Sequence, residues 1–243
     1  MKNKVAMITG ASVGIGRAVA LQMAEKGAKL VLVDMNAETL AKLEEELKEY
    51  NAEVMSFVCD VSDEKAVNEA VQAATEKMGG IDILVNSAAI WRVKSLFWET
   101  SIETWKKLLD VNVMGVVYCT NAVLPKMLEK GYGRIVNVAS VAGVYGNANM
   151  SVYSATKGAL IAMSKALAKE VVEKGIVVNC VSPGMVSPSV ELDMEYTKAT
   201  DKCYAGRTGS DRENADLICF LASEKNGYVV GQNIQIDGCR KKQ

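Results

Sequence analysis

Short apolar runs alternate with longer amphipathic segments along the whole chain. An apolar run bounded by turn residues predicts a buried strand, whereas apolar residues at helical spacing predict a helix. The runs predict strands at 5–8, 30–33, 54–59, 83–85, 135–138, 176–181 and 234–236. The segments between them predict helices at 15–26, 37–50, 63–78, 102–130, 152–174 and 210–221.

The predicted strands are apolar on both faces, which is typical of a parallel sheet covered by helices on both sides. The chain contains no linker, repeat or low-complexity tract. We therefore expect an α/β fold with one doubly wound domain over residues 1–243. Two stretches, 87–100 and 183–208, lack a regular pattern, and we expect the second to form a substrate lid within this domain.

The composition is that of a globular protein, with 49% hydrophobic and 23% charged residues and a formal net charge of -1. This charge gives no indication of a nucleic acid or a membrane surface as partner. We find no signal-peptide pattern, and no apolar stretch that approaches the ~20 residues of a membrane span. We expect a cytoplasmic protein whose Arg240, Lys241 and Lys242 form a short solvated tail.

The chain contains no histidine. Ser-His-Asp and Cys-His catalysis and histidine-based metal sites are therefore excluded, and acid–base chemistry must use a carboxylate, lysine, tyrosine or cysteine. The six cysteines show no Cys-x-x-Cys pair or zinc-site spacing, so we expect no metal. Four of them lie in apolar runs and are expected to be buried reduced thiols, which suits a reducing compartment: Cys59, Cys119, Cys180 and Cys219.

A glycine-rich loop, Thr9 to Gly16, follows the first strand and leads into a helix. Its glycines, at 10, 14 and 16, let the backbone turn sharply, and the N-terminus of the helix attracts a pyrophosphate. The second strand ends at Asp34, 18 residues after Gly16, where a carboxylate can accept hydrogen bonds from a ribose 2′-hydroxyl and repel a 2′-phosphate. These features predict NAD rather than NADP. Alternatively, the glycines pack a helix against a strand, and Asp34 caps the next helix.

The chain resembles the short-chain dehydrogenase/reductase family over almost its whole length. The resemblance is carried by the Thr9–Gly16 loop, Asp60-Val61, Asn86-Ser87-Ala88-Ala89, a Tyr-x-x-x-Lys pair 13 residues after Ser140, and Pro183-Gly184. It implies a Rossmann domain with a seven-stranded parallel sheet in the order 3-2-1-4-5-6-7. It also implies a homotetramer or homodimer that packs through helices 102–130 and 152–174.

The resemblance also implies site residues. The catalytic group is Asn112, Ser140, Tyr153 and Lys157. The NAD-binding group is Gly10, Ser12, Val13, Gly14, Ile15, Gly16, Asp34, Met35, Asp60, Val61, Asn86, Ala88, Tyr153, Lys157, Pro183, Gly184 and Val186. The sequence departs from the family pattern at Ser87, Ala89 and Cys239, and at Pro188, where a threonine is usual and Ser187 or Ser189 is the candidate replacement.

Tyr153 and Lys157 are four residues apart on a predicted helix and therefore share a face. A nearby ammonium, together with an oxidised nicotinamide, lowers the pKa of a phenol, so Tyr153 is the expected proton carrier in hydride transfer. Ser140 is expected to orient the substrate oxygen, and Asn112 to hold a water that links Lys157 to solvent. Each residue also has a structural alternative: a strand end for Ser140, a local backbone contact for Asn112 and a surface pair for Tyr153–Lys157.

The substrate side is predicted to be mostly apolar, which favours a hydroxysteroid or a bile acid. Two alternatives remain open: a reductase of 3-oxoacyl thioesters, and a non-catalytic NAD(H) sensor. The residues expected to contact the substrate are Trp91, Ser140, Ala142, Tyr145 and Met185.

Overall fold

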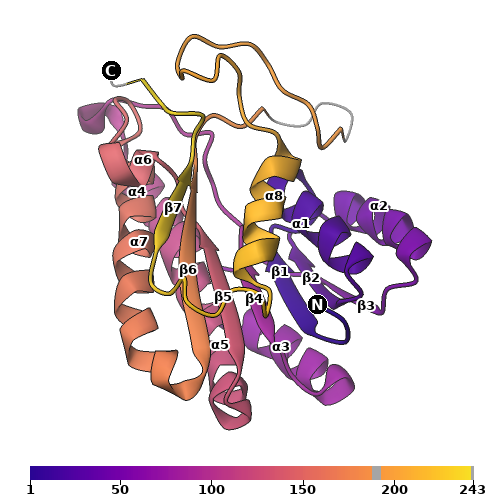
Figure 1. Cartoon of the computed structure of the whole chain (residues 1–243). Coiled ribbons are helices and arrows are strands. Elements are labelled where there is room, and N and C mark those ends of the chain that lie inside the picture. The colour runs from indigo at the N-terminus through magenta and orange to yellow at the C-terminus, as the bar shows by residue number, and fades with distance from the viewer. Residues whose placement is uncertain (188–192, 242–243) are drawn as a thin grey trace.

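The computed structural model describes residues 1–187 and 193–241. Seven strands form one sheet in the order β3-β2-β1-β4-β5-β6-β7 (Figure 1), and every neighbouring pair is parallel. This confirms the predicted sheet and its strand order. The strands are β1 (Val5–Thr9), β2 (Lys29–Asp34), β3 (Val54–Val58), β4 (Ile83–Asn86), β5 (Gly133–Val138), β6 (Ile176–Pro183) and β7 (Asn233–Ile236).

The helices lie close to their predicted positions, with two differences. The predicted helix 102–130 is interrupted by a π-helical turn at Asp110–Met114, and a short helix that the sequence did not predict follows β5. The helices are α1 (Gly14–Glu25), α2 (Ala37–Leu47), α3 (Glu64–Met78), α4 (Ile102–Leu109), α5 (Gly115–Lys130), α6 (Ala142–Tyr145), α7 (Ser151–Val171) and α8 (Asp211–Leu221).

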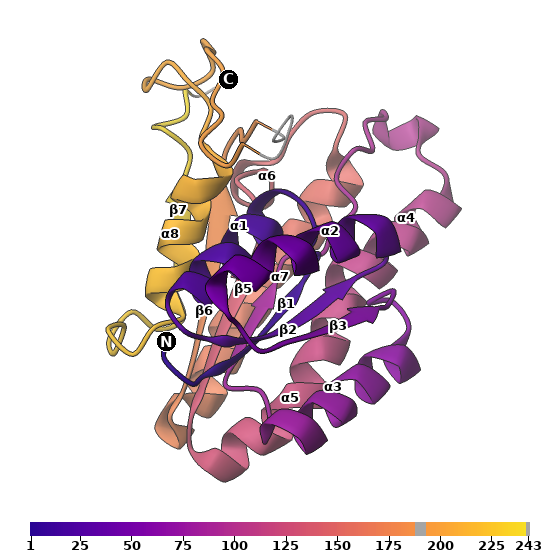
Figure 2. The ribbon, with the colours of Figure 1, turned by 90° about the vertical axis from the view of Figure 1, so that its right-hand side faces the viewer.

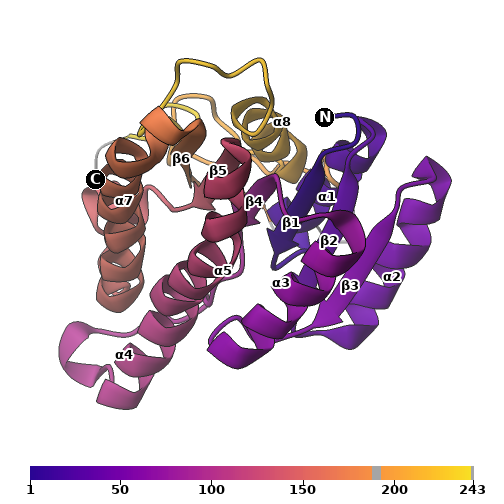
Figure 3. The same cartoon turned by 90° about the horizontal axis from the view of Figure 1, so that it is seen from below.

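Both faces of the sheet are buried, each in a separate core. Along β1, Ala6 and Ile8 face a core shared with α1, α2 and α8, whereas Val5 and Met7 face a core shared with α3, α5 and α7. Figure 3 shows α1 and α8 on one side of the sheet and α3 and α5 on the other. Because successive side chains of a strand point to opposite faces, a strand covered on both sides must be apolar throughout.

Four of the eight α-helices in the described part of the chain are capped at their start by a side chain. Asn36, Asp63, Ser101 and Ser210 accept hydrogen bonds from backbone N–H groups at the starts of α2, α3, α4 and α8. At the start of α8, Ser210 and Glu213 form a capping box. By contrast, α1 has no side-chain cap. Its first N–H groups are therefore left for another acceptor.

The helical run from Ile102 to Lys130 is long and apolar enough, by length and composition alone, to cross a membrane. This differs from our expectation that no stretch approaches that length. In the structure, Cys119, Val123 and Met127 of this run pack into the core beneath the sheet. The apolar character therefore has a packing role, as in the core helix of a globular protein.

The stretch 183–208, predicted as irregular, is partly ordered. Within it, Thr208 N donates to Lys198 O (2.8 Å) and Thr200 N donates to Gly206 O (2.9 Å), which closes a short hairpin. This segment lies at the carboxyl ends of the strands in Figures 1 and 2. Whether it acts as a lid stays a prediction.

The C-terminal segment is attached to this hairpin. Tyr204 N donates to Cys239 O and Lys241 N donates to Lys202 O, each at 3.0 Å. The expected solvated tail is therefore wrong for Arg240 and Lys241, which are half-buried, while Lys242 lies outside the described residues. Cys239, a departure from the family pattern, has a left-handed backbone (φ +59°), a conformation for which glycine is better suited.

Candidate active site

The glycine loop after β1 is packed against the segment after β4. A Cβ atom at Gly10 would lie 2.7 Å from Ala88 Cα, and one at Gly16 would lie 2.0 Å from Gly10 O. Thr9 Oγ1 also accepts hydrogen bonds from Ser87 N (3.1 Å) and Ala88 N (3.2 Å). Because these bonds use the backbone of residues 87 and 88, the departures from the family pattern there leave the connection intact.

The glycine loop leads directly into the N-terminus of α1. Its N-cap residue is Val13, and the helix starts at Gly14 with no side-chain hydrogen bond to the first turn. Gly14 also has a left-handed backbone (φ +56°). Free N–H groups at a helix N-terminus, with the positive end of the helix dipole, form a binding site for a phosphate group.

Asp34 lies at the end of β2, and its carboxylate is oriented by two backbone groups. Ser12 N donates to Asp34 Oδ2 and Asn36 N donates to Asp34 Oδ1, each at 3.0 Å. Asn36, not Asp34, caps α2, so the capping alternative for Asp34 is wrong. Arg17, the basic residue nearest the loop in sequence, forms an ion pair with Glu46 of α2. Asp34 therefore remains available to a ribose hydroxyl, since a carboxylate accepts up to four hydrogen bonds.

Two of the residues predicted to bind NAD follow β3. Asp60 is exposed, and its Oδ1 accepts from Ser62 N (2.9 Å) and Ser62 Oγ (2.8 Å). The side chain of Val61 is buried against Gly115, where a Cβ atom would lie 2.7 Å from Val61 Cγ2. A contact from Val61 to a cofactor would therefore come from its backbone.

A buried polar network runs from Asn86 into α7, and the sequence alone did not reveal its inner members. Asn86 Nδ2 donates to Asn137 Oδ1, and Asn137 Nδ2 donates to Ser164 Oγ, each at 2.8 Å. Asn86 Oδ1 is buried and has no hydrogen-bond partner among the described residues. An unpaired buried acceptor carries a free-energy cost unless a ligand or water donates to it.

Ser140 and Tyr153 are brought together by α6 and α7. The Ser140 hydroxyl lies close enough to the Tyr153 hydroxyl to lower its pKa, and it accepts a hydrogen bond from Ala142 N (3.1 Å). Burial raises the pKa of Tyr153, and the Ser140 contact offsets part of that rise. The expected substrate contact at Ala142 is corrected, because its side chain is only 1% exposed and its amide instead orients Ser140.

Lys157 is fully buried one turn after Tyr153. Its Nζ donates to Val138 O at the end of β5 (2.7 Å) and lies 5.8 Å from the centre of the Tyr153 ring. Burial lowers the pKa of Lys157 to about 8. Without a cofactor, therefore, burial has the larger effect on both groups. The lowering of the Tyr153 pKa that we expect from Lys157 together with an oxidised nicotinamide stays a prediction.

Asn112 is at the centre of the π-helical turn between α4 and α5. Its Nδ2 donates to Ile90 O (3.0 Å) and Thr156 Oγ1 (3.2 Å), and its Oδ1 accepts from Ile90 N (2.8 Å). Both Nδ2 protons are thus used, and Asn112 fixes the segment after β4 against α7. The expected water bound by Asn112 stays a prediction.

The end of β6 and the residue after it are held by backbone hydrogen bonds to two other segments. Pro183 O accepts from Val141 N (3.1 Å), and Gly184 N donates to Ile236 O (2.9 Å). A Cβ atom at Gly184 would lie 2.7 Å from Asp237 Cα, so a side chain does not fit there. This fixes the backbone beside the predicted nicotinamide site.

Val186, the next residue but one, forms a β-bridge with Gly209. The Ser187 hydroxyl is buried and paired with Thr208 Oγ1 (2.7 Å), so its hydrogen-bonding capacity is partly used. Pro188 and the other candidate replacement, Ser189, lie outside the described residues.

Exposed apolar side chains surround these groups at the carboxyl ends of the strands. They follow five different strands of the sheet, and isolated chains seldom expose so many large apolar groups at one edge without a binding role. They are Val13, Met35, Trp91, Tyr145 and Met185, which are 55%, 72%, 47%, 58% and 53% exposed.

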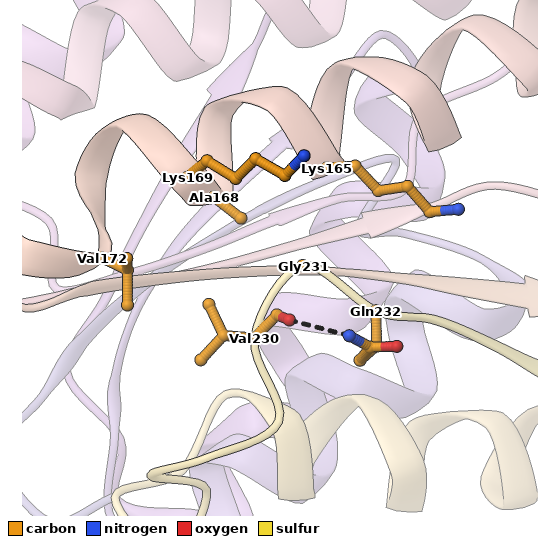
Figure 4. A pocket seen from close by; sticks show the side chains of 7 residues that line it. All are labelled: Lys165, Ala168, Lys169, Val172, Val230, Gly231 and Gln232. Carbon is orange, nitrogen blue, oxygen red and sulfur yellow. Dashed lines mark hydrogen bonds between the residues drawn. The ribbon is translucent and has the colours of Figure 1, made fainter.

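A separate hollow lies between α7 and the segment before β7 (Figure 4). It is lined by Lys165, Lys169, Val230, Gly231 and Gln232, among others, and Gln232 Nε2 donates to Val230 O (3.0 Å). It contains none of the predicted site residues.

The open N-terminus of α1, the Asp34 carboxylate and the unpaired Asn86 Oδ1 together fit a dinucleotide across the strand ends. The sequence matches the family model of the short chain dehydrogenases over residues 4–200. The chain belongs to this family and is an oxidoreductase that uses a nicotinamide cofactor and acts on CH–OH groups.

Several relatives and solved structures match nearly the whole chain. It is 39% identical over 241 residues to a 3-oxoacyl-[acyl-carrier-protein] reductase FabG of Thermotoga maritima, covering 98% of each chain. It is 34% identical to a 2-dehydro-3-deoxy-L-rhamnonate dehydrogenase (NAD(+)) of a Sphingomonas species, covering 98% of this chain and 95% of the relative. The structure of an NAD+-bound xylitol dehydrogenase is similar, with a TM-score of 0.90 and 33% identity over 98% of each chain.

Replacing Lys157 by methionine should stabilise the fold near neutral pH while removing a catalytic group. Since burial holds the Lys157 pKa at about 8, against an ordinary 10.5, the unfolded chain binds more protons between these pH values. Below pH 8 the folded state carries the full cost of a buried charge. Lys157→Met should therefore raise the free energy of unfolding at pH 7 by about 1–3 kcal/mol, and this gain should shrink as the pH rises towards 10.5.

Urea unfolding of both proteins across this pH range measures the difference. Lys169→Met, an exposed position on the same helix, is the control and should change stability little. A Lys157→Met protein no more stable than wild type at pH 7 would contradict the interpretation.

Proposed function

We propose that this protein is an NAD(H)-dependent oxidoreductase that interconverts a secondary alcohol and a ketone. The group formed by Ser140, Tyr153 and Lys157 supports this most directly. The Ser140 hydroxyl lowers the pKa of the Tyr153 hydroxyl, and the buried ammonium lies 5.8 Å from the Tyr153 ring centre. The three side chains supply an oxygen-binding donor, a proton carrier and a neighbouring cation.

The roles of these residues follow from their chemistry. The bound nicotinamide would accept or donate the hydride. In oxidation Tyr153 Oη takes the proton of the substrate hydroxyl, and in reduction it returns a proton to the carbonyl oxygen. Ser140 Oγ donates a hydrogen bond to the same oxygen. The Lys157 ammonium favours the phenolate, and the Nζ donors not used by Val138 O can hold ribose hydroxyls.

NAD is the proposed cofactor because of Asp34. Its negative charge lies where the ribose of a dinucleotide is expected, and Arg17 is already paired with Glu46. A 2′-phosphate would meet this carboxylate without a neighbouring cation to balance it. Among the relatives, one is named an NAD(+) dehydrogenase and one structure contains NAD+.

Asp34 and the Ser140–Tyr153–Lys157 group restrict the cofactor and the reaction more than they restrict the substrate class. The exposed Trp91, Tyr145 and Met185 support an apolar substrate such as a hydroxysteroid or a bile acid. A second candidate is a 3-oxoacyl thioester, which is supported by the 39% identity to a reductase of that name. A candidate of another class, a non-catalytic NAD(H) sensor, would have no need of the Ser140–Tyr153–Lys157 group.

Substituting Tyr153 by phenylalanine tests the proposal. The wild-type protein should reduce NAD+ with at least one member of a panel of hydroxysteroids, bile acids, hydroxyacyl thioesters and simple secondary alcohols. Tyr153→Phe should lower kcat by roughly 10²- to 10⁴-fold because it removes the proton carrier, while NADH binding changes little. Absorbance of the reduced cofactor and NADH fluorescence measure the two effects. NADH binding without turnover of any compound would favour the sensor instead.

Removing the charge of Asp34 should change the cofactor preference. Asp34→Asn keeps the size of the side chain and one acceptor but no longer repels a 2′-phosphate. We expect kcat/KM with NAD+ to fall and the NADP+/NAD+ ratio of kcat/KM to rise by roughly 10-fold or more. Glu38→Gln, an exposed charge in the first turn of α2, is the matched control. A wild-type preference for NADP+ would overturn the assignment.

We also propose a homotetramer or homodimer. Around the start of α4, the side chains of Phe97, Trp98 and Ile102 are 61%, 78% and 70% exposed, and large apolar patches of this kind mark subunit contacts. Light scattering should give two or four times the 26.2 kDa chain mass. Trp98→Lys should shift the protein towards smaller species, and an unchanged mass would count against this surface.

We propose a cytoplasmic location because the described cysteines are free thiols, which suits a reducing compartment. Cys59, Cys119, Cys180, Cys203 and Cys219 are buried and free, and no described cysteine is in a disulfide. Burial raises the pKa of Cys119 to about 12, which keeps that thiol protonated and unreactive.

A further inference from the structure

Trp91 and Tyr145, the two aromatic residues expected to contact the substrate, each lie against an arginine side chain. The guanidinium of Arg92 lies 4.8 Å from the centre of the Trp91 ring, and that of Arg240 lies 5.9 Å from the centre of the Tyr145 ring. An aromatic ring with a guanidinium against it presents a cation as well as an apolar surface. The rim of the site is therefore less apolar than the sequence suggested.

Arg240 is connected to the catalytic helix through one residue. Its Nη2 donates to Asn147 Oδ1 (2.8 Å), and Asn147 N donates in turn to Ser154 Oγ (3.2 Å). Ser154 directly follows Tyr153 in α7. Arg240 thus lies on the same rim as the proton carrier, although it is 87 residues away in sequence.

The loop that carries Asn147 also meets the segment with Arg92. Ser95 N donates to Asn149 O (2.9 Å), so the segments that follow β4, β5 and β7 come together at this rim. Two basic side chains, Arg92 and Arg240, are contributed by the first and the last of these segments.

The charge of Arg240 is not balanced by an acid in the described part of the chain. Two other arginines near the same hairpin are balanced, since Arg207 pairs with Glu213 and Arg212 pairs with Glu195. The nearest acid in sequence, Asp237, accepts a hydrogen bond from Cys239 N instead. Among the described residues only Asn147 accepts a hydrogen bond from Arg240, which leaves most of its five N–H donors available.

Anchoring of the C-terminus does not account for this side chain. The backbone of residues 238, 239 and 241 already forms hydrogen bonds with Ala205 N, Tyr204 N and Lys202 O, each at 3.0 Å. These bonds place the Arg240 side chain towards Tyr145 and Asn147 without its help. An arginine held by its backbone, with free donors at the edge of an active site, is suited to bind a carboxylate or a phosphate with two parallel hydrogen bonds.

We propose that Arg240 binds an anionic group, a carboxylate or a phosphate, on the substrate whose alcohol Tyr153 oxidises. The proposal rests on the proposed function and narrows its substrate class. It favours an acid with an apolar body, or an acyl thioester on a phosphate-bearing carrier, over a neutral steroid. Arg92 supplies a second positive charge at the same rim.

Two pairs of compounds test this, and in each pair only the anionic group differs. The carboxylate pair is cholate and its methyl ester. The phosphate pair is the 3-hydroxybutyryl thioester of 4′-phosphopantetheine and that of pantetheine. Turnover with NAD+ is measured for wild type, Arg240→Met and Arg240→Lys. The control is Lys241→Met, the next residue, whose ammonium lies over Tyr204 at 5.4 Å.

We expect wild type to prefer the charged member of one pair, and that pair identifies the source of the anion. Arg240→Met should lower kcat/KM for this compound by roughly 10- to 100-fold, mainly through KM, and should leave the neutral member within about twofold. Arg240→Lys should recover part of the loss, and Lys241→Met should behave like wild type.

Calorimetric binding of the same four compounds to the protein with NADH repeats the comparison without turnover. Three outcomes would overturn the role of Arg240. They are equal binding of the charged and neutral members, equal losses of binding for both members in Arg240→Met, and no binding of any of the four compounds. Turnover of neutral alcohols that depends on Tyr153 would then still support the proposed function, so the two failures are distinguishable.

Discussion

The buried ammonium of Lys157 is the constraint on which the site depends. A charge removed from water lowers stability unless polar groups surround it, and here the Val138 carbonyl at the end of β5 accepts its hydrogen bond (2.7 Å). This bond fixes α7 against the end of β5 and sets the position of Tyr153 one turn earlier. Gly143 contributes by its lack of a side chain, because a Cβ atom there would lie 2.5 Å from the backbone carbon of Lys157.

The rest of the site is organised by polar contacts between strand ends. Thr9 joins the loop after β1 to the segment after β4, and Asn112 joins that segment to Thr156 in α7. Asn86 and Asn137 extend the connection towards Ser164. Because these groups are buried and most are paired, moving one of them leaves a partner unsatisfied, which makes the arrangement rigid. Rigidity of this kind is what positions a proton carrier against a substrate.

The rim of the site is built differently from its base. It consists of exposed side chains on segments after β4, β5 and β7, held together by a few hydrogen bonds between backbones and by the contact of Arg240 with Asn147. Surface segments of this kind differ more readily among relatives than the sheet does. This agrees with the matches of the chain to relatives that are named for quite different substrates and have similar sequence identity to it.

The sequence by itself determined the sheet, its layers and the residues at its base. Strands apolar on both faces require helices on both sides. The spacing of Gly10, Asp34 and Ser140 marks strand ends, and Gly16, Tyr153 and Lys157 lie on helices α1 and α7 beside them. Such features are local: a periodicity, a turn or a pair one helical turn apart can be read from neighbouring residues.

Only the tertiary structure decided which distant groups meet. Nothing in the neighbouring sequence marks Asn137 and Ser164 as site residues. Only the fold buries them in one hydrogen-bonded network with Asn86. The pKa of Tyr153 also could not be read from its distance in sequence to Lys157, because burial in the folded chain raises it. Arg240 belongs to a segment that the sequence suggested is a solvated tail. It reaches the active-site rim because backbone hydrogen bonds to a hairpin some 35 residues earlier hold it there, and no local pattern encodes such a contact.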